Sequence, residues 1–589
     1  MMIRYCSSLL KSYKISLPSL VRCSRPSVCS KLQSAWLRYC TLVKTRPDIK
    51  QLRAFPFVCL GAGILLQKSS VLKHSWWYCS VAQCSARTLP ENLLQEGGNH
   101  VHHDSLLILL LRKLYSASFL LMRTISLFVR FFPLLCVYPL TFVIPGSRWL
   151  WWSGLLVAME SAGPSFIKLG QWASTRRDLF SAEFCDRFSV LHHQVAVHKW
   201  RHTDKRLTQA FGPGWRSLFI SFKEDCEPVG SGCVAQVYKA YFDLDKIDAQ
   251  LKQRLSENDA EESVLTNRIG IPVAVKVCHP DIAELIERDL TIMRFMASCL
   301  TVCLPSLHWL SLTECVREFA QLMEKQLDLV NEAKCLDRFA VNFSSCAQIS
   351  VPTPIWPYIT KEVLVETFEE GEHISNFIQN KQCSKELKKT LAELGVGALL
   401  KMVFIDNFIH GDLHPGNILV RNADKYKEQQ SRSKNRVKLV LLDVGITASM
   451  KESDKHKFVE VFKAVLRGKG EEVARLFLTK SRISKCRNPA EFTREMTKLV
   501  HLARQEAASL GKVQVGSLLS QVFGLMIEHR IKVESNFASV ILAIAVLEGL
   551  GRSLNPELNI LKSARPFLLP GTWKEEKQFR PMDDFFDIS

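Results

Sequence analysis

His410-Gly411-Asp412-Leu413-His414-Pro415-Gly416-Asn417 brings together residue types that phosphoryl-transfer chemistry requires. Asp412 can orient an attacking hydroxyl or water and accept its proton, and Asn417 can hold a magnesium ion. Further along the chain, the apolar run 437–442 is typical of a strand and ends at Asp443-Val444-Gly445. A carboxylate at such a strand end can bind a magnesium that bridges two phosphates. The spacing therefore predicts Asp412 as a catalytic residue and Asn417 and Asp443 as metal ligands.

A glycine-containing turn lies upstream, between the strand-like runs 218–222 and 237–241. Its glycines would let the backbone approach phosphates and present N–H donors to them. The strand-like run 273–277 follows, and its one charged residue, Lys276, would contact the α- and β-phosphates as a further catalytic residue. The pattern predicts these nucleotide-binding residues: Val229, Gly230, Ser231, Gly232, Cys233, Val237 and Lys276.

These elements follow one another in the chain order of the protein-kinase fold. Each has an ordinary alternative, because small-residue turns and edge-strand lysines are common, and either aspartate could be a turn cap or a solvated carboxylate. Together they predict an α+β, bilobal protein-kinase-like fold that binds ATP and Mg²⁺. No Ala-Pro-Glu triplet follows Asp443, and 450–466 has the pattern of an amphipathic helix. A platform for docking a peptide is therefore not expected.

The run Lys168-Leu169-Gly170-Gln171, taken together with 410–417, resembles the aarF-domain, or UbiB-type, family of atypical kinases. The resemblance covers about 105–570. In that family the Lys-x-Gly-Gln segment folds over the active site and blocks the groove where a peptide would lie. The resemblance therefore implies a regulatory role for Lys168, Gly170 and Gln171.

The resemblance also implies roles for residues on a helix of the N-terminal lobe, where the family carries Glu-x-Asp followed by Glu-Ala. Here the first run reads Gln326-Leu327-Asp328, and Glu332 begins the second. Glu332 is thereby implied to be the catalytic partner of Lys276, and Asp328 a regulatory partner of Lys168. Gln326 replaces the family's glutamate, which is expected to weaken the regulatory contact.

The nucleotide loop departs from the family a second time, since Gly230-Ser231-Gly232-Cys233 stands where the family usually has an alanine-rich stretch. Our hypothesis is that the extra backbone freedom changes nucleotide preference or permits phosphoryl transfer. The affinities of Gly230→Ala and Gly232→Ala variants for ADP and ATP test this hypothesis, and unchanged affinities and turnover would contradict it.

The N-terminal region is basic and rich in serine, and no Asp or Glu occurs before residue 48. This composition predicts a mitochondrial transit peptide at 1–50, followed by a linker at 51–104; a disordered basic tail is the alternative. Residues 105–160 are predicted to form a membrane-proximal helical segment. A true span within 105–147 and an amphipathic or buried hairpin packed on the catalytic domain both stay open.

The remaining sequence has the apolar content of a globular protein, interrupted by polar stretches at 243–268 and 421–436 that read as surface insertions. The expected divisions are an N-lobe at 161–400 with the Lys-x-Gly-Gln segment and the nucleotide loop, a C-lobe at 401–570 with the catalytic and metal-binding loops, and a C-terminal tail at 571–589.

The formal net charge of +19 favours anionic partners, here mitochondrial membrane lipids. Nucleic acid is not expected, because no module that reads it is present and the basic residues are not interleaved with aromatics. The 19 cysteines are scattered, and Cys136, Cys299 and Cys303 lie in apolar runs. This pattern predicts reduced, buried thiols and no metal cluster, and the polar run 100–104 reads as a loop rather than a metal site.

The leading hypothesis is an ATP-dependent phosphotransferase or ATPase associated with the mitochondrial inner membrane, acting on a small or lipid-like substrate. A role in coenzyme Q biosynthesis and mitochondrial lipid metabolism, with coenzyme Q biosynthetic enzymes as partners, is implied by the resemblance alone. Two alternatives stay open: a non-catalytic, nucleotide-gated membrane scaffold and a protein serine/threonine kinase. The intact catalytic residues favour catalysis, whereas the blocking segment favours the scaffold.

Overall fold

The computed structural model describes residues 101–567. Gaps in this range lie at 145–146, 177–178, 189–190, 192–196, 223–225, 247–269, 304–310, 381–382, 424–436, 479–485, 487, 511–514, 530, 532–534, 559, 561–562 and 565–566. The expected transit peptide, nearly all of the expected linker, most of both polar insertions and the C-terminal tail are outside the described residues. The described chain forms two compact units, the first with 101–105 and 125–155 and the second with 106–124 and 156–567.

The first unit is a helical hairpin. It contains the C-terminal part of α5 (Val101–Val137), the 3₁₀ helix η4 (Tyr138–Phe142) and the N-terminal part of α6 (Ser147–Ala162). The indole Nε1 of Trp151 donates a hydrogen bond to the carbonyl of Leu134 at 2.8 Å, which ties α6 to α5. The helical character predicted for 105–160 is confirmed.

One described helix is long and apolar enough to cross a membrane. The segment Ala117–Phe142 has 26 residues and a mean hydropathy of 1.8, and 17% of its most apolar window is buried. Length and composition alone are weak evidence, because core helices of soluble proteins can have the same properties. Many of its apolar side chains are exposed, however, including Leu121, Met122, Ile125, Phe128, Phe132, Leu135 and Phe142.

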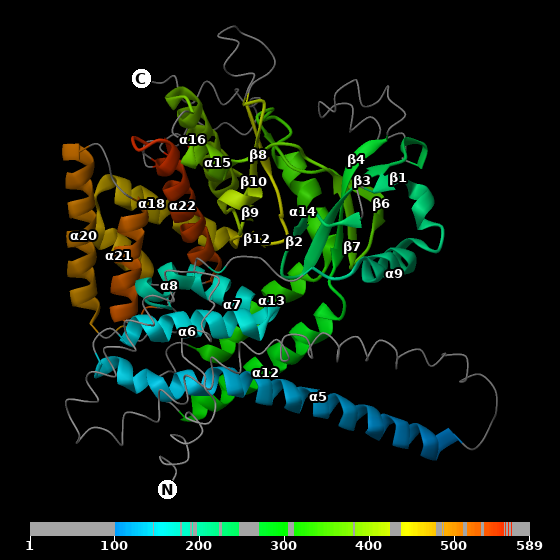
Figure 1. Ribbon diagram of the computed structural model, residues 1–589. Coiled ribbons are helices and arrows are strands. Elements are labelled where there is room, and N and C mark those ends of the chain that lie inside the picture. The colour runs from blue at the N-terminus through cyan, green and yellow to red at the C-terminus, as the bar shows by residue number, and fades with distance from the viewer. Residues whose placement is uncertain are drawn as a thin grey trace, which may run out of the picture. The chain divides into compact units, whose positions relative to one another are not determined.

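The second unit contains a six-stranded antiparallel sheet in its N-terminal half, sheet A (Figure 1). The strand order is β1-β3-β4-β7-β6, and β2 pairs with β3. The strands predicted around the glycine turn and around Lys276 are confirmed. Their bounds are β1 (Phe219–Phe222), β2 (Gly230–Ser231), β3 (Ala235–Phe242), β4 (Ile271–Cys278), β6 (Pro354–Ile359) and β7 (Val363–Thr367).

Strand alternation gives sheet A two different faces. On one face, Val273, Val275 and Val277 join a small core with Leu207 of α9 (Trp200–Phe211) and with Trp215 of η5 (Trp215–Leu218). The other face carries the intervening residues of the strands. It therefore presents the polar groups of the site, while β-branched residues fill the opposite core.

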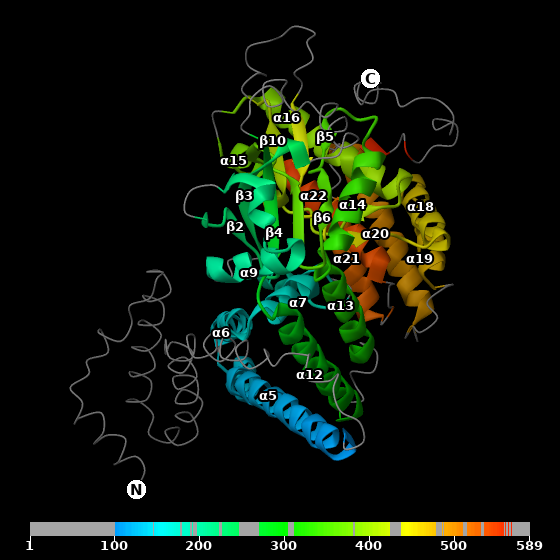
Figure 2. The same cartoon turned by 90° about the vertical axis from the view of Figure 1, so that its right-hand side faces the viewer.

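Four helices complete the N-terminal half around sheet A. Figure 2 shows α14 beside β6, with α13 and α12 below it. The side chain of Asp328 caps α14 by accepting a hydrogen bond from the amide of Val330 at 3.0 Å, and this capping fixes where α14 begins. The bounds are α7 (Pro164–Thr175), α12 (Ile282–Cys303), α13 (Leu312–Gln326) and α14 (Leu329–Asn342). Two shorter helices are α8 (Ala182–Phe188) and η7 (Leu244–Lys246).

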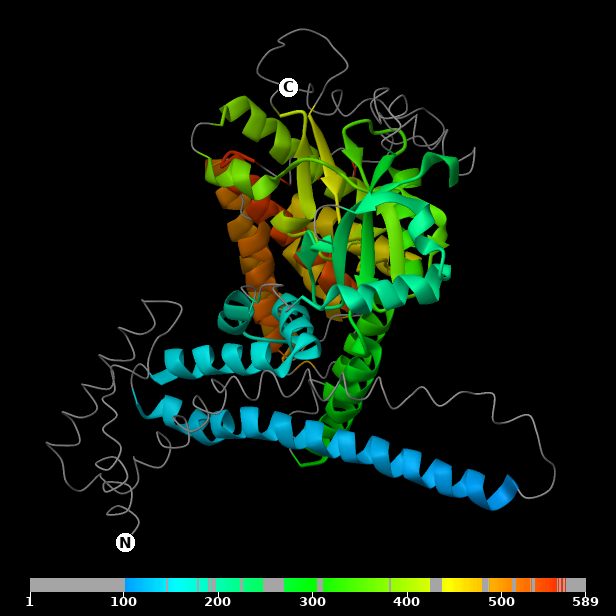
Figure 3. The same ribbon diagram turned by 45° about the vertical axis from the view of Figure 1, so that its right-hand side comes forward.

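A second sheet, sheet B, has the order β5-β11-β10-β8, and its yellow strands stand beside the green strands of sheet A in Figure 3. A two-stranded ladder of β9 and β12 flanks the catalytic loop. The bounds are β5 (Ile349–Ser350), β8 (Glu372–His373), β9 (Ile409–His410), β10 (Ile418–Arg421), β11 (Lys438–Leu441) and β12 (Thr447–Ala448).

The structure places the change of lobe earlier than residue 400, the expected boundary. The last strand of sheet A is β7, which ends at Thr367, and β8, which begins at Glu372, already pairs with β10 of sheet B. The helix α16 (Lys385–Leu400) likewise packs on α22 (Ser535–Leu554). No signal of this change is visible in the sequence, since pairing between distant strands decides it.

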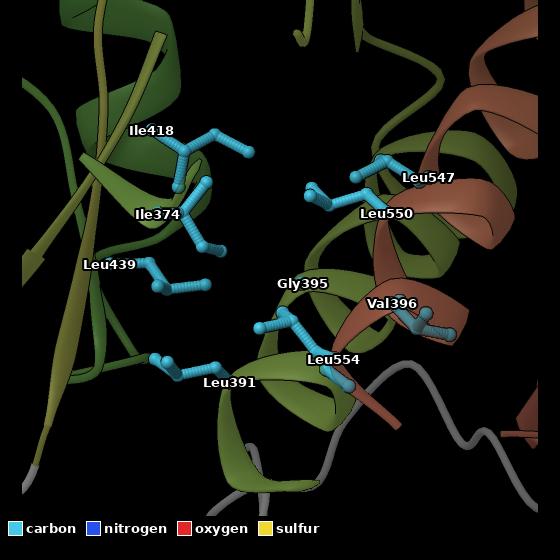
Figure 4. A pocket seen from close by; sticks show the side chains of 11 residues that line it. Ile374, Leu391, Gly395, Val396, Ile418, Leu439, Leu547, Leu550 and Leu554 are labelled. Atoms are coloured by element: carbon cyan, nitrogen blue, oxygen red, sulfur yellow. The ribbon is translucent and has the colours of Figure 1, made fainter. Parts of the chain in front are cut away.

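Helices fill the C-terminal half, and α20, α21 and α22 lie together in Figure 1. The amphipathic helix expected at 450–466 is confirmed as α18 (Glu452–Arg467). A small apolar pocket lies between sheet B, represented by Ile418 and Leu439, and α22, represented by Leu547 (Figure 4). The other bounds are α15 (Ile374–Gln379), the π-helix η9 (Lys401–Ile405), η10 (Pro415–Asn417), α19 (Gly470–Leu478), α20 (Pro489–Leu510) and α21 (Val515–Glu528).

The cysteines of the described residues are free thiols. The prediction of burial was wrong for Cys136 and Cys303, which are exposed, and Cys299 is half-buried. These thiols lie on apolar helices whose outer faces are not covered, so an apolar run did not mean an interior position. Six others are buried: Cys185, Cys233, Cys278, Cys315, Cys335 and Cys346.

Candidate active site

The catalytic loop is held by a buried histidine. The His410 side chain is fully buried, its Nε2 lies 2.9 Å from the carbonyl oxygen of Leu442, and its Nδ1 accepts from the amide of Asp412 at 3.2 Å. Burial lowers the pKa of His410, so the ring is neutral, with the proton on Nε2. The histidine thus links the strand that leads to Asp443 with the turn that presents Asp412.

Asn417 lies where it can act as a metal ligand. Its side-chain amide donates to the carbonyl of Asp412 at 3.0 Å, and its backbone carbonyl accepts from Leu442 at 2.8 Å. The amide donates through nitrogen, which leaves the side-chain oxygen available to a cation. Strand β10 begins just after Asn417, and strand β11 ends just before Asp443. The two strands are antiparallel neighbours, so both proposed ligands lie at the same end of this pair of strands.

An ion-pair cluster joins the two lobes at Lys276. Its Nζ lies 2.7 Å and 2.9 Å from the two carboxylate oxygens of Glu332, and 3.1 Å from Oδ1 of Asp443. Burial opposes the charge on Lys276, but the carboxylates of Asp443 and Glu332 overcome this effect and raise its pKa. The same lysine lowers the pKa of Asp443, which keeps this carboxylate ionised. The expected pairing of Lys276 with Glu332 is confirmed.

Asp443 has a left-handed backbone conformation, with φ of 52°. Aspartate adopts this region more readily than most residues. Its side chain is 45% exposed, whereas that of Glu332 is 6% exposed. Solvent therefore reaches Asp443 beside Lys276, on the side of the lobe junction that we call the cleft, and Glu332 supports Lys276 from inside.

The nucleotide loop is a tight turn between β2 and β3. The amide of Val229 donates to the carbonyl of Val237 at 2.8 Å, and the amide of Gly232 donates to Ala235 at 2.9 Å. The hydroxyl of Ser231 is buried and has no hydrogen-bond partner among the described residues. An acceptor such as a phosphate oxygen would satisfy this hydroxyl, so the loop fits a nucleotide.

The side chains at the edges of this loop face different ways. Val229 is exposed, while Cys233 is buried, and burial raises the pKa of its thiol. A Cβ added at Gly230 would meet nothing, and one at Gly232 would come no closer than 3.5 Å to Ala235. Alanine therefore fits at both glycines, so any effect of such a change on nucleotide affinity would come from backbone freedom rather than a clash.

A buried chain of hydrogen bonds supports the nucleotide loop, and sequence reasoning missed it. The Nδ1 atoms of His198 and His279 are 2.8 Å apart, and Nε2 of His279 is 2.9 Å from the carbonyl oxygen of Gly232. Nε2 of His198 is 2.9 Å from the Thr203 hydroxyl, which is 2.7 Å from the hydroxyl of Tyr238. The buried segment before α9 and the end of β4 thereby hold the carbonyl of Gly232 in place.

The direction of each bond in this chain follows from the carbonyl of Gly232, which can only accept. His279 donates from Nε2, so in a neutral ring its Nδ1 accepts from the N–H of His198. The Nε2 of His198 then accepts from Thr203, and the Thr203 oxygen accepts from Tyr238. A second proton on His279 would set its Nδ1–H against the N–H of His198 and break the bond between the rings. Burial lowers the pKa of His198 to about 3 and also lowers that of His279, so both rings are neutral.

This buried pair predicts a pH-dependent stability. In the folded chain the pKa of His198 is lowered to about 3, whereas the unfolded chain takes up the proton near its ordinary value of 6.5. The unfolded state therefore binds more protons between these values, and stability must fall as the pH decreases through this range. We expect the free energy of unfolding to decrease by up to about 1.4 kcal/mol per pH unit, measured by urea unfolding. A His198→Asn variant should show a shallower slope, and an equal slope would contradict the assignment.

The Lys-x-Gly-Gln segment lies on α7, and it reaches Asp412, the predicted catalytic aspartate. Lys168 is buried, and its Nζ lies 3.9 Å from Oδ2 of Asp412. Gln171 donates to the carbonyl of Leu191 at 3.0 Å, and a Cβ at Gly170 would collide with the side chain of Leu191. A larger residue at this position would have to displace the side chain of Leu191.

The regulatory contact expected for Asp328 is different in the structure. Asp328 caps α14, and the ion pair that the structure gives Lys168 is with Asp412. The oxygen Oε1 of Gln326 is buried without a hydrogen-bond partner among the described residues. The cap was not anticipated, because the family pattern alone cannot distinguish a side chain that bonds its own helix from one that crosses to another.

The lobes therefore bring together the predicted nucleotide loop, Lys276, two candidate metal ligands and the predicted catalytic aspartate, Asp412. This arrangement defines a nucleotide-binding protein of the kinase-like class. Among the residues that the structure describes, no group of three or more His, Cys, Asp or Glu side chains is placed to hold a metal.

Comparison with known proteins identifies the family. Residues 264–477 match the ABC1 atypical kinase-like domain, and 504–559 match the UbiB helical domain. The probable serine/threonine-protein kinase abkC of Dictyostelium discoideum is 33% identical over 508 residues, which cover 76% of this chain and 68% of that protein. A mitochondrial ABC1 family protein of Schizosaccharomyces pombe is 31% identical over 503 residues, covering 76% and 71%. The chain belongs to the ABC1, or UbiB-type, family of atypical kinases.

A solved structure, the complex of Rv3197 with erythromycin from Mycobacterium tuberculosis, is also similar. It covers 69% of this chain and 92% of its own, with 18% identity and a TM-score of 0.43.

Proposed function

We propose that this chain is an ATP-dependent phosphotransferase or ATPase associated with the mitochondrial inner membrane. The observation that carries the proposal is the meeting of Lys276, Asp412, Asn417 and Asp443 in one cleft, with the Lys276–Glu332 pair intact at 2.7 Å. A chain selected only for scaffolding would have no need of this whole set. The presence of all four residues in one site supports in-line phosphoryl transfer.

Each residue of the site is proposed to have a separate role in binding ATP and transferring its phosphoryl group. Lys276 and the amides of the nucleotide loop would position the phosphates of ATP, and Ser231 would donate its unpartnered hydroxyl. Asn417 and Asp443 would hold Mg²⁺, which supplies neutralisation of charge on the phosphates when bound. Asp412 would orient the attacking hydroxyl or water and take its proton.

The substrate is proposed to be small or lipid-like. The contact of Lys168 with Asp412 supports this view, because α7 then stands where a peptide would have to approach the acceptor position. The apolar segment Ala117–Phe142 and the net charge of +19 support contact with anionic lipids of the mitochondrial membrane. A role with coenzyme Q biosynthetic enzymes follows from the family resemblance alone.

A finer assignment within the family rests on two runs. Residues 171–178 and 534–554 resemble the vertebrate aarF-domain-containing kinase 2, and we propose that the chain belongs to this branch. The mitochondrial relative from Schizosaccharomyces pombe supports a mitochondrial location.

The second candidate function is a non-catalytic, nucleotide-gated scaffold, which is favoured by the same Lys168–Asp412 contact. ATP hydrolysis by the full purified chain separates the two. We expect Mg²⁺-dependent turnover that rises with vesicles of anionic phospholipid and not with neutral vesicles. Nucleotide binding without turnover under any of these conditions would contradict the enzyme and support the scaffold.

A further inference from the structure

Glu366 is a carboxyl group on the cleft side of sheet A to which neither the motifs nor the family resemblance assigns a role. Val363 and Val365 of β7 belong to the core on the far face, whereas Leu364 belongs to the core on the cleft side. Since side chains alternate along a strand, Glu366 shares the face of Leu364. Leu364 is paired with Lys276, so Glu366 and the lysine lie on the same face.

The strand register places Glu366 at the inner end of the cleft. It is paired with Ala274, two residues before Lys276, which corresponds to about 7 Å along the strand. β7 ends at the next residue, Thr367, and the chain enters sheet B at Glu372. A nucleotide whose phosphates lie at Lys276 would extend its base toward this junction of the lobes.

Neighbouring glutamates are paired, but Glu366 is not. Glu369 accepts from Arg421 at 2.8 Å, and Glu370 accepts from Lys239 at 2.7 Å. Within the described part of the chain, the carboxyl of Glu366 has no hydrogen bond or ion pair, although it is half-buried. Its oxygens are not among the fully buried atoms that lack a partner, so water can reach them. A ligand that displaces this water must donate a hydrogen bond in its place.

The charges around this carboxyl are mixed. Burial, and after it the carboxylate of Glu332, raise the pKa of Glu366 to about 8, and Lys276 opposes them. Asp443 and Glu369 also raise it. A carboxyl group keeps an accepting oxygen in either protonation state, so it can accept a hydrogen bond on both sides of this pKa.

We infer that Glu366 reads the nucleobase by accepting a hydrogen bond from the exocyclic amino group of adenine. The inference rests on the proposed function, since it requires ATP in this cleft. Adenine carries this amino group at the outer edge of the base, and a purine without it has no donor there. Glu366 therefore favours adenine nucleotides by a specific contact, in addition to whatever the rest of the cleft contributes.

The test compares two ligands that differ by one amino group, each bound by protein variants that differ at Glu366. The dissociation constants of ATP and of purine riboside triphosphate, which lacks only the amino group, are measured by calorimetry on the full chain. Wild type should bind ATP about tenfold more tightly, as expected for one hydrogen bond. In Glu366→Met the ratio should fall to about one through a loss of ATP affinity alone.

Two further variants make this result specific. Glu366→Gln keeps an accepting oxygen and should keep a preference for ATP, whereas a merely structural role would not separate glutamine from methionine in this ratio. Glu370→Gln makes the same chemical change at an exposed glutamate and should leave the ratio at the wild-type value. An unchanged melting temperature shows that each variant is folded.

The outcomes distinguish the inference from the proposed function. Equal binding of the two nucleotides by wild type, or a wild-type ratio in Glu366→Met, would overturn the inference and leave ATP binding intact. Failure of wild type to bind either nucleotide would overturn the proposed function and the inference together.

Discussion

Asp443→Asn is expected to abolish Mg²⁺-dependent nucleotide binding. Asp443 is the ionised carboxylate that faces the cleft, and Lys276 at 3.1 Å keeps its pKa low. Asparagine keeps the shape but removes the charge that a hard cation requires. Removing a residue that only hydrogen-bonds to a metal ligand typically lowers metal affinity by about 10–100-fold. Removing the ligand itself should therefore weaken Mg²⁺-dependent nucleotide binding by about 100-fold or more. Titration of ATP with and without Mg²⁺ measures this effect.

Asp412→Asn is the matched control, since it makes the same change at the other aspartate of the cleft. Its amide should preserve nucleotide binding but lower turnover by about 10²–10⁴-fold, the usual contribution of a general base. Function in cells then separates the two hypotheses. If Asp443→Asn loses function while Asp412→Asn retains it, chemistry is dispensable and the scaffold hypothesis is correct. If Asp443→Asn binds Mg²⁺ and ATP normally, the assignment of Asp443 is wrong.

The cleft could be predicted from sequence to the extent that its groups lie on short local runs. Lys276 lies within a strand-like run, and Asp412 and Asn417 lie in one short loop. Their spacing along the chain therefore left few possible roles for these three side chains. Glu332 required the family resemblance, because nothing in the sequence between it and Lys276 shows that helix and strand will meet. The ion pair is present at 2.7 Å, while the catalytic roles themselves stay predictions.

Other features depend on tertiary packing and could not be predicted from spacing. His198 and His279 are distant in sequence, and each looks ordinary in its own segment until the fold brings their Nδ1 atoms to 2.8 Å. Glu366 reads as one acid in an acidic run, Glu366 to Glu372. Only the register of β7 against β4 shows that Glu366 faces the cleft. Glu370, by contrast, is exposed and accepts a hydrogen bond from Lys239. The cap that Asp328 forms on α14 was likewise not predictable from the family pattern, and its regulatory role stays a prediction.

The second large effect is expected at the buried ion pair between α5 and α12. Arg123 and Asp289 are 4% and 0% exposed, and two hydrogen bonds of 2.6 Å and 2.8 Å join them. The guanidinium also donates to the carbonyl of Ala162 at 2.6 Å. All of these residues belong to the second compact unit, so the pair fixes residues 106–124 on that unit. Asp289→Ala would leave a buried guanidinium without its counter-charge and should lower the free energy of unfolding by about 3–5 kcal/mol, measured by urea unfolding.

A double variant tests whether this loss arises from the unpaired charge. Arg123→Met with Asp289→Leu replaces both ions by apolar groups of similar size and should recover most of the stability, because no unpaired charge is then left at this position. Arg294→Ala on the same helix breaks only an exposed pair with Glu324 and should cost no more than about 1 kcal/mol. If Asp289→Ala and Arg294→Ala prove equally mild, the pair does not hold α5. If the double variant is as unstable as Asp289→Ala, the loss comes from packing. With the pair confirmed, Arg123 marks where α5 passes from the second compact unit into the first.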